Sequence, residues 1–275
     1  MIQIIVALFG LVFGSFLNVC IVRVPRGESI VSPGSHCTGC GHSIRWYDNI
    51  PVLSYVLLRG RCRDCRRRIS PLYPLVEILT GAAFLLEFWR YGATPEFIKG
   101  AAFAMLMIVL IFTDLRERRL PHKITIFGIA LGIVLSLLIP VDNRPVAWIL
   151  SQWGYFPPWI LLSLIGALVG ALVGGGLFFG VGELFYRVRH KEGLGFGDVM
   201  LMLLVGTFLG PSLTLITIML GSLLGSVIAV PLSLISSKFR NYQWPYGTFL
   251  GIAAIHASIG GDALLRAYLQ WGGFR

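Results

Sequence analysis

Long apolar stretches recur along the whole chain, and they constrain the fold more than any other feature. A helix needs about 20 mostly apolar residues to cross roughly 30 Å of hydrocarbon. Stretches near this length occupy residues 1–22, 74–89, 97–113, 124–140, 159–186 and 246–269. A longer block, 199–235, is broken at Gly210-Pro211-Ser212, which predicts a short helix over 198–209 and a longer one after Ser212. We therefore expect an all-α polytopic membrane protein with about eight transmembrane helices.

The composition excludes two other classes of protein. Hydrophobic residues make up 56% of the 275 residues and charged residues only 13%, which is too apolar for a soluble enzyme with one core. Intrinsic disorder needs the opposite balance. Residues 1–22 lack the basic start and the cleavage site of a signal peptide, so we expect them to form the first transmembrane helix.

The positive charges predict the orientation. Lys and Arg number 23 against 13 Asp and Glu, and most of the excess lies in alternate connections between the apolar stretches. The first connection, residues 23–73, alone holds nine of them. Because Lys and Arg concentrate on the cytoplasmic side, the pattern favours an N-out and C-out topology. The net charge of +10 then reflects topology, and the run Arg66-Arg67-Arg68 is better explained by contact with membrane lipids than with nucleic acid.

Four cysteines stand in this first connection, which we call the four-cysteine loop (residues 23–73). Two C-x2-C pairs, Cys37 with Cys40 and Cys62 with Cys65, have 21 residues between them. Such pairs present two thiolates from one turn, and two turns complete a tetrahedral zinc site. Two disulfides are the alternative, but a cytoplasmic loop is in a reducing compartment. Four thiolates fill the coordination sphere, so we expect a structural zinc ion in a zinc-ribbon-like loop.

Two aspartates are placed where the apolar stretches meet the predicted cytoplasmic side. Asp114 ends the third stretch and Asp198 begins the sixth, within Gly195-Phe196-Gly197-Asp198. Two nearby carboxyl groups in a partly dry site share one proton, so one activates water while the other protonates a peptide carbonyl. Gly195 and Gly197 would let an extended peptide approach. The alternative is that Asp114 pairs with a nearby arginine and that Asp198 caps its own helix.

The whole pattern resembles the bacterial type IV prepilin peptidases, which are GxGD-type intramembrane aspartic proteases. The motifs that carry the resemblance span nearly the whole chain: Gly14-Ser15-Phe16-Leu17-Asn18, the two C-x2-C pairs around Asn49-Ile50-Pro51-Val52-Leu53-Ser54, Tyr73-Pro74-Leu75-Val76-Glu77, Asp114 with Pro121, Gly195-Phe196-Gly197-Asp198, and Pro245-Tyr246-Gly247. The chain departs from the family at His122, where an Asp is common, and at Met200, where a Lys is common. Neither change removes Asp114 or Asp198.

The resemblance implies an enzyme of the bacterial inner membrane with two activities. It implies cleavage of the leader from type IV prepilins and type II secretion pseudopilins after a glycine, with Asp114 and Asp198 as the catalytic pair at the cytoplasmic face. It also implies N-methylation of the new terminus with S-adenosylmethionine. Candidate cofactor contacts are the polar residues near the membrane edge of the first cytoplasmic region: Asn18, Arg23, Arg59, Tyr73 and Glu77. The alternative, at least as well supported by the sequence, is that these residues anchor at the membrane interface or close the loop on its helices.

On this interpretation the chain has three parts: the first helix (1–22), the four-cysteine loop associated with methyl transfer (23–73), and a seven-helix protease core (74–275). Two alternatives stay open. A cleavage-only peptidase of the preflagellin type would lack the methylation step. A non-enzymatic scaffold or transporter would use the four-cysteine loop as a zinc-binding docking module.

Overall fold

The structure is a computed structural model that describes residues 1–190, 193–235, 242 and 244–272. Its regular elements over these residues are helices, joined by turns and two isolated β-bridges. The chain divides into two compact units, Met1–Thr113 and Asp114–Arg275, and each is described by itself.

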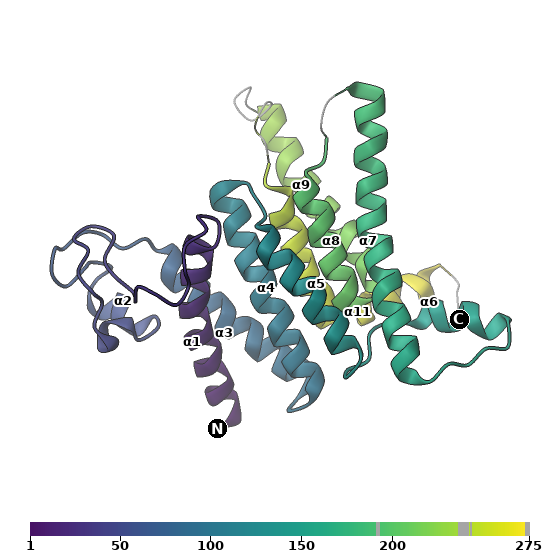
Figure 1. Ribbon diagram of the computed structural model, residues 1–275, viewed down its shortest axis with the longest axis horizontal. Helices are drawn as coiled ribbons and strands as arrows, with labels where there is room; N and C mark the ends of the chain where they lie inside the picture. Colours follow the sequence, from purple (N-terminus) through teal and green to yellow (C-terminus); the bar gives the residue numbers. More distant parts are fainter. Residues whose placement is uncertain (191–192, 236–241, 243, 273–275) are drawn as a thin grey trace. The chain divides into compact units, whose positions relative to one another are not determined.

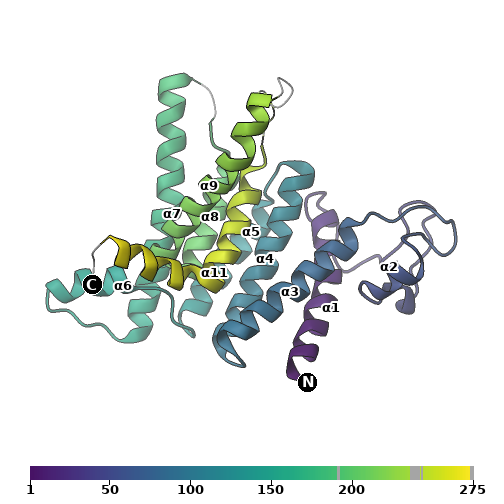
Figure 2. The ribbon, with the colours of Figure 1, turned by 180° about the vertical axis from the view of Figure 1, so that it is seen from behind.

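In the first unit, α1 (Ile2–Arg23) and α3 (Leu72–Tyr91) lie side by side (Figures 1 and 2). Small residues permit the close approach. A Cβ on Gly10 would lie 2.7 Å from the Cα of Gly81, and one on Gly14 would lie 2.6 Å from the Cα of Glu77. Between helices in a membrane, such close backbone packing takes the place of a hydrophobic driving force. The first unit also contains most of α4 (Pro95–Glu117), whose Phe97 ring packs edge-on against Phe88 of α3.

The four-cysteine loop connects α1 to α3. It contains a 3-10 turn, η1 (Trp46–Asn49), and one short helix, α2 (Leu53–Leu57). Two bridges, His36 with Ser43 and Arg61 with Arg68, close the turns that carry the cysteines. The loop is therefore ordered by local turns and not by a sheet.

The second unit begins at the last turn of α4. It continues through α5 (His122–Ser136), α6 (Arg144–Gln152), α7 (Trp159–Arg189), α8 (Phe196–Leu209), α9 (Pro211–Ile235) and α11 (Tyr246–Trp271). The helix α8 packs against α5 and α7, and α9 pairs with α11 (Figure 1).

Glycines bring α7 and α8 into backbone contact. A Cβ on Gly170 would lie 2.5 Å from the carbonyl oxygen of Gly206, and one on Gly174 would lie 2.5 Å from the carbonyl oxygen of Met202. Gly170 and Gly174 are four residues apart and so share one face of α7, which is the small-xxx-small pattern of membrane helix pairs. This contact fixes the position of α8.

Side chains from two helices hold the start of α11. The Tyr246 hydroxyl lies 2.8 Å from Ser222 Oγ of α9, and the Tyr246 ring stacks on Phe178 of α7. The first turn of α11 is thereby fixed against two neighbouring helices.

The expectation of an all-helical fold is confirmed over the described residues, and each of the eight apolar stretches coincides with a helix. Six helices in the described residues are long and apolar enough to cross a membrane: α1, α3, α4, α7, α9 and α11. The other two, α5 and α8, are apolar but shorter. The count of eight spans and the N-out and C-out orientation therefore stay predictions, as does the division into segments 1–22, 23–73 and 74–275. The sequence reading missed α6, whose nine residues are too few to span a bilayer.

Candidate active site and four-cysteine cluster

Asp114 lies in the last turn of α4 and is almost completely enclosed, with 6% of its surface exposed. Its Oδ2 accepts two hydrogen bonds from Thr248 of α11, from the backbone N–H at 2.8 Å and from Oγ1 at 3.1 Å. The carboxylate thus sits at the N-terminus of a long helix, where free N–H groups favour negative charge. The nearby arginines that could have paired with Asp114 are Arg116 and Arg118, and Arg118 instead places its guanidinium over the Tyr242 ring, 4.4 Å from the centroid.

Asp198 lies in the first turn of α8, directly after an extended segment. Gly195 precedes the helix with extended backbone angles (φ −71°, ψ 140°), and its carbonyl accepts the backbone N–H of Asp198 at 3.0 Å. A Cβ on Gly195 would lie 3.5 Å from Asp198 Oδ2. A Cβ on Gly197 would lie 3.1 Å from Leu120. Gly195 therefore leaves space beside the carboxylate, whereas Gly197 allows α8 to pack closely on Leu120.

The two carboxylates meet at Gly247. A Cβ built on Gly247 would lie 3.1 Å from Asp114 Oδ2 and 3.2 Å from Asp198 Oδ1. Since both oxygens are this close to one point, they are at most about 6 Å apart. Carboxyl groups at this range can hold a water molecule and a peptide carbonyl between them, which is the arrangement that general acid–base hydrolysis requires.

Gly247 and Thr248 are site residues whose roles the sequence reading missed. Pro245-Tyr246-Gly247 was part of the family resemblance, but no spacing argument connects it to Asp114, which lies 134 residues before Thr248. The available signal was a Gly-Thr pair at the start of a helix, and this pair is too common to predict a catalytic neighbour.

Each of the two departures from the family follows one of the aspartates in the sequence, His122 after Asp114 and Met200 after Asp198. The His122 ring, at the start of α5, lies 5.9 Å from the Phe196 ring of α8, between centroids. Met200 lies in α8, two residues after Asp198. Both positions are on elements that meet near the carboxylates, yet the contacts of Asp114 are made by Thr248.

The four cysteines form one cluster. The Sγ atoms of Cys37, Cys40, Cys62 and Cys65 all lie within 4.8 Å of one another. Cys37 Sγ and Cys65 Sγ are 3.7 Å apart, and all four residues are free cysteines. Tetrahedral zinc with Zn–S distances of about 2.3 Å places its sulfurs about 3.8 Å apart. The cluster therefore fits a zinc ion held by four thiolates.

Each C-x2-C pair sits in a tight turn. The N–H of Cys37 bonds the His42 carbonyl at 2.9 Å, and the N–H of Cys62 bonds the Arg67 carbonyl at 2.9 Å. Backbone N–H groups of Cys40 and Gly39 point at the Cys37 sulfur and lower the pKa of its thiol to about 6. The thiolate is the form that binds metal, so the turn prepares Cys37 as a ligand.

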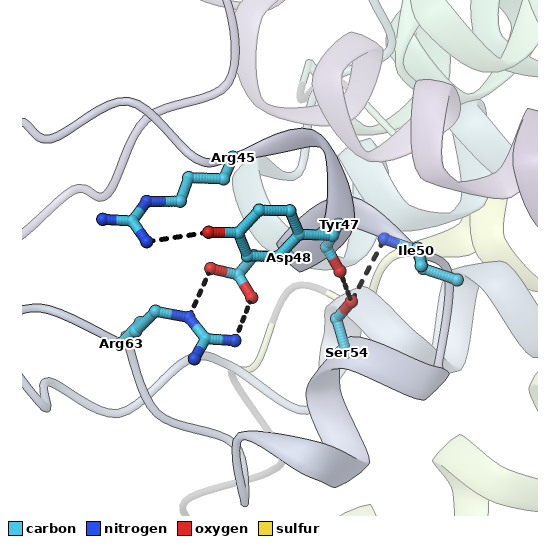
Figure 3. A network of polar contacts seen from close by, with 6 residues as sticks. All are labelled: Arg45, Tyr47, Asp48, Ile50, Ser54 and Arg63. Carbon is cyan, nitrogen blue, oxygen red and sulfur yellow. Dashed lines mark hydrogen bonds and ion pairs between the residues drawn. The ribbon is translucent and has the colours of Figure 1, made fainter.

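A polar network joins η1, α2 and the second cysteine turn (Figure 3). The Arg63 guanidinium donates two hydrogen bonds to Asp48, at 2.6 and 2.8 Å, and holds the pKa of that carboxyl below its ordinary value. Arg45 donates to the Tyr47 hydroxyl at 2.7 Å. Ser54 Oγ donates to the Tyr47 carbonyl and accepts the N–H of Ile50. Arg63 adjoins Cys62, so the network connects the cysteine turn to α2.

The structure uses most of the candidate cofactor residues to attach the loop to its helices. Asn18 donates to the Tyr73 carbonyl at 3.0 Å. Arg23 donates to the carbonyls of Ser29 and Gly34, and Glu77 accepts the N–H of Val52 at 2.7 Å. These contacts bring Asn18 together with Tyr73. Arg23 and Glu77 instead bind two different segments of the loop, Arg23 at Ser29 and Gly34 and Glu77 at Val52.

Arg59 differs from the other four candidates. It follows α2 with an exposed side chain and a positive φ of 52°. A positive φ is uncommon for a residue with a side chain and places Arg59 at a sharp change of chain direction.

Comparison with known proteins identifies the family. Residues 8–91 match the bacterial peptidase A24 N-terminal domain, and residues 101–230 match the type IV leader peptidase family. A prepilin leader peptidase/N-methyltransferase of Pseudomonas putida is 33% identical over 96% of this chain and 93% of its own length. Proteins of the same name are 31% identical in Pseudomonas aeruginosa and 30% identical in Neisseria gonorrhoeae, with 98% and 96% of this chain and 93% of each relative covered.

No solved structure matches the chain significantly. The likeness to these relatives extends over both compact units and includes the helices that carry Asp114 and Asp198. The resemblance seen in the sequence motifs is confirmed. This chain belongs to the type IV leader peptidase family.

Proposed function

We propose that the protein removes the leader peptide from type IV prepilins and pseudopilins after a glycine, and then N-methylates the new terminal residue. The observation that carries the proteolytic step is the approach of Asp114 and Asp198 to Gly247. The names of the relatives, which specify both a leader peptidase and an N-methyltransferase, support the pairing of the two reactions.

The proposed cleavage uses the two carboxyl groups as an acid–base pair. Thr248 donates two hydrogen bonds to Asp114 Oδ2, which stabilise a negative charge there. Asp114 then takes a proton from the attacking water, and Asp198 gives the shared proton to the carbonyl oxygen of the scissile bond. When the C–N bond of the tetrahedral intermediate breaks, Asp114 gives its proton to the leaving amine and Asp198 takes a proton from a hydroxyl of the intermediate, which restores the starting pair.

The substrate strand is proposed to lie along Gly195. Its extended backbone and the absence of a side chain next to Asp198 Oδ2 leave room for a main-chain segment. A substrate glycine before the scissile bond suits the same crowded place, because a larger side chain would press on the carboxylates. Gly197 supports this arrangement indirectly by allowing α8 to pack on Leu120.

The four-cysteine loop is proposed to serve methyl transfer with a structural zinc ion on Cys37, Cys40, Cys62 and Cys65. When bound, S-adenosylmethionine supplies the methyl group. Asn18, Arg23 and Glu77 would act mainly by positioning the loop, since their polar groups already bond its backbone or that of Tyr73. Arg59 and Tyr73 are the remaining candidates for direct contact with the cofactor.

The proposed location is the bacterial inner membrane, with an N-out and C-out topology and the reaction at the cytoplasmic face. The charge distribution supports it, because 18 of the 23 Lys and Arg residues lie in the four connections that this topology assigns to the cytoplasm, residues 23–73, 114–123, 187–198 and 236–246. A prepilin presents its basic leader on that side, followed by an apolar helix.

The test is mass spectrometry of a model prepilin incubated with the purified protein and S-adenosylmethionine. We expect loss of the leader and one methyl group on the new terminus, and neither product with Asp114→Asn. A pilin that already lacks its leader, given to the same variant, separates the activities and should still be methylated. Cleavage without methylation in the wild type would reduce the proposal to a peptidase, and no cleavage would refute it.

A further inference from the structure

The four-cysteine loop reaches back alongside the helices that it connects. Glu77 of α3 lies at the level of Gly14, since a Cβ on Gly14 would almost touch the Glu77 Cα. Gly14 is nine residues before Arg23, the end of α1, which corresponds to roughly 13 Å along the helix axis. Glu77 also accepts the N–H of Val52, the residue before α2. The helix α2 therefore begins next to α3, at a level that lies within the length of α1, and Figure 2 shows it between the levels of the two ends of α1.

One face of α2 is apolar and uncovered. Leu53, Val56 and Leu57 occupy positions i, i+3 and i+4 and so share a face, and 51%, 63% and 71% of their surfaces are exposed. We call these three residues the α2 apolar face. Next to this face, Ser54 is buried and holds the turn of Tyr47 and Ile50 (Figure 3). The orientation of α2 is thus fixed by hydrogen bonds, with its apolar face outward.

Arginines follow the α2 apolar face along the chain. Exposed arginines occur at six positions just after the helix: Arg59, Arg61, Arg63, Arg66, Arg67 and Arg68. Of these, Arg63 pairs with Asp48. An apolar helical face next to a group of basic residues is typical of segments that enter the boundary between headgroups and acyl chains of an anionic leaflet. Trp46 in the adjoining η1 turn is also exposed, and tryptophan favours the same boundary.

We propose that α2 is a lipid-inserted segment, with Leu53, Val56 and Leu57 in the acyl region of the membrane and the following arginines at the headgroups. The occupant is lipid and not a partner protein, because α2 is attached through Val52 to Glu77, which lies within the candidate membrane span α3 at the level of Gly14 of the span α1. Apolar side chains of these spans are also exposed at a similar depth along the helices: Phe16 lies two residues after Gly14, and Leu75 lies two residues before Glu77. The proposal does not depend on the peptidase or methyltransferase assignment.

The test is site-specific photo-crosslinking in the full-length protein, reconstituted in vesicles of phosphatidylethanolamine and phosphatidylglycerol. The crosslinking residue p-benzoylphenylalanine is placed at Leu57, and in a second variant at Val56. The matched control is Val31, an apolar residue of the same loop that is 85% exposed but far in sequence from α2. Phe16 on α1 is the positive control for lipid contact.

We expect lipid adducts at Leu57 and Val56 in at least about fivefold higher yield than at Val31, and comparable with Phe16. Equal yields at Leu57, Val56 and Val31 would overturn the proposal. So would crosslinks from Leu57 and Val56 to protein in place of lipid while Phe16 labels lipid, because α2 would then contact a second protein segment.

Discussion

The cysteine cluster and the aspartate pair are both compact groups of reactive side chains, but the chain assembles them differently. Each half of the cluster comes from four consecutive residues in a local turn. The two aspartates are 84 residues apart in the sequence and come from two helices, α4 and α8. Thr248, which orients Asp114, comes from a third helix, α11. A site made by turns can be predicted from spacing, whereas a site made by helix packing becomes visible only when the fold is known.

The first way to test this comparison is to remove the carboxylates. Asp114→Asn and Asp198→Asn should each lower the rate of leader cleavage by about 10² to 10⁴-fold, because each removes one partner of the acid–base pair. Zinc content should stay unchanged, since the cysteine turns fold locally. Cleavage is measured by mass spectrometry and zinc by elemental analysis, with Glu183→Gln as the control, a half-buried carboxylate of α7 whose partner is Arg187 of the same helix. Near-normal cleavage by either variant would remove that residue from the catalytic pair.

The second prediction concerns the point where the carboxylates meet. Gly247→Ala should lower cleavage by about 10²-fold, because the added methyl would lie between Asp114 and Asp198 and displace one of them. Gly176→Ala is the matched control, since a Cβ there meets nothing within 4 Å. Initial cleavage rates of the two variants give the comparison. Equal rates would show that the carboxylates do not act together at this position.

Removal of a single cysteine from the cluster should affect methylation more than cleavage. Cys37→Ser and Cys62→Ser should each lose zinc and lower methylation of a pre-cleaved pilin by about tenfold or more, since zinc stabilises the loop. Cleavage should fall less, because the carboxylates belong to the other unit. Cys20→Ser on α1 is the control, as Cys20 lies outside the cluster. Equal loss of both activities would mean that the loop is required for cleavage as well.

The smallest expected effect is the pH dependence of the Asp48 ion pair. Arg63 lowers the pKa of Asp48 in the folded loop, so the pair stabilises the loop above the ordinary Asp pKa of about 3.9. That contribution disappears as the pH falls through the lowered folded pKa. Asp48→Asn should therefore speed amide exchange in η1 slightly near neutral pH, with the difference from wild type shrinking in acid. Asp64→Asn, at an exposed position nearby, controls for charge, and a pH-independent difference would contradict the prediction.

Much of the fold could be predicted because apolar length determines where helices form. The stretch 159–186 corresponds to α7, which ends three residues later than predicted, at Arg189. The break at Gly210-Pro211 separates α8 from α9 as expected. The nine-residue α6 was not predicted, because a short helix leaves no membrane-length signal.

The site was predictable only in part. Asp114 and Asp198 stood out because charged residues at the ends of apolar helices are rare. Thr248 and Gly247 did not, because their importance arises only from the contacts that the start of α11 makes with Asp114 and Asp198. Glu77 was expected among cofactor contacts, yet its hydrogen bond to Val52 depends on a loop conformation that no periodicity encodes.

The glycine contact between α7 and α8 has a consequence for handling the protein. Backbone atoms of Gly170 and Gly206 touch directly, so the helices are held by van der Waals contact and not by exclusion of water. Such a contact stabilises the association of the two helices as much in a detergent micelle as in a bilayer, since both surround the helices with alkyl chains. Extraction should therefore leave the position of Asp198 nearly unchanged, which makes purified protein a faithful material for kinetic study.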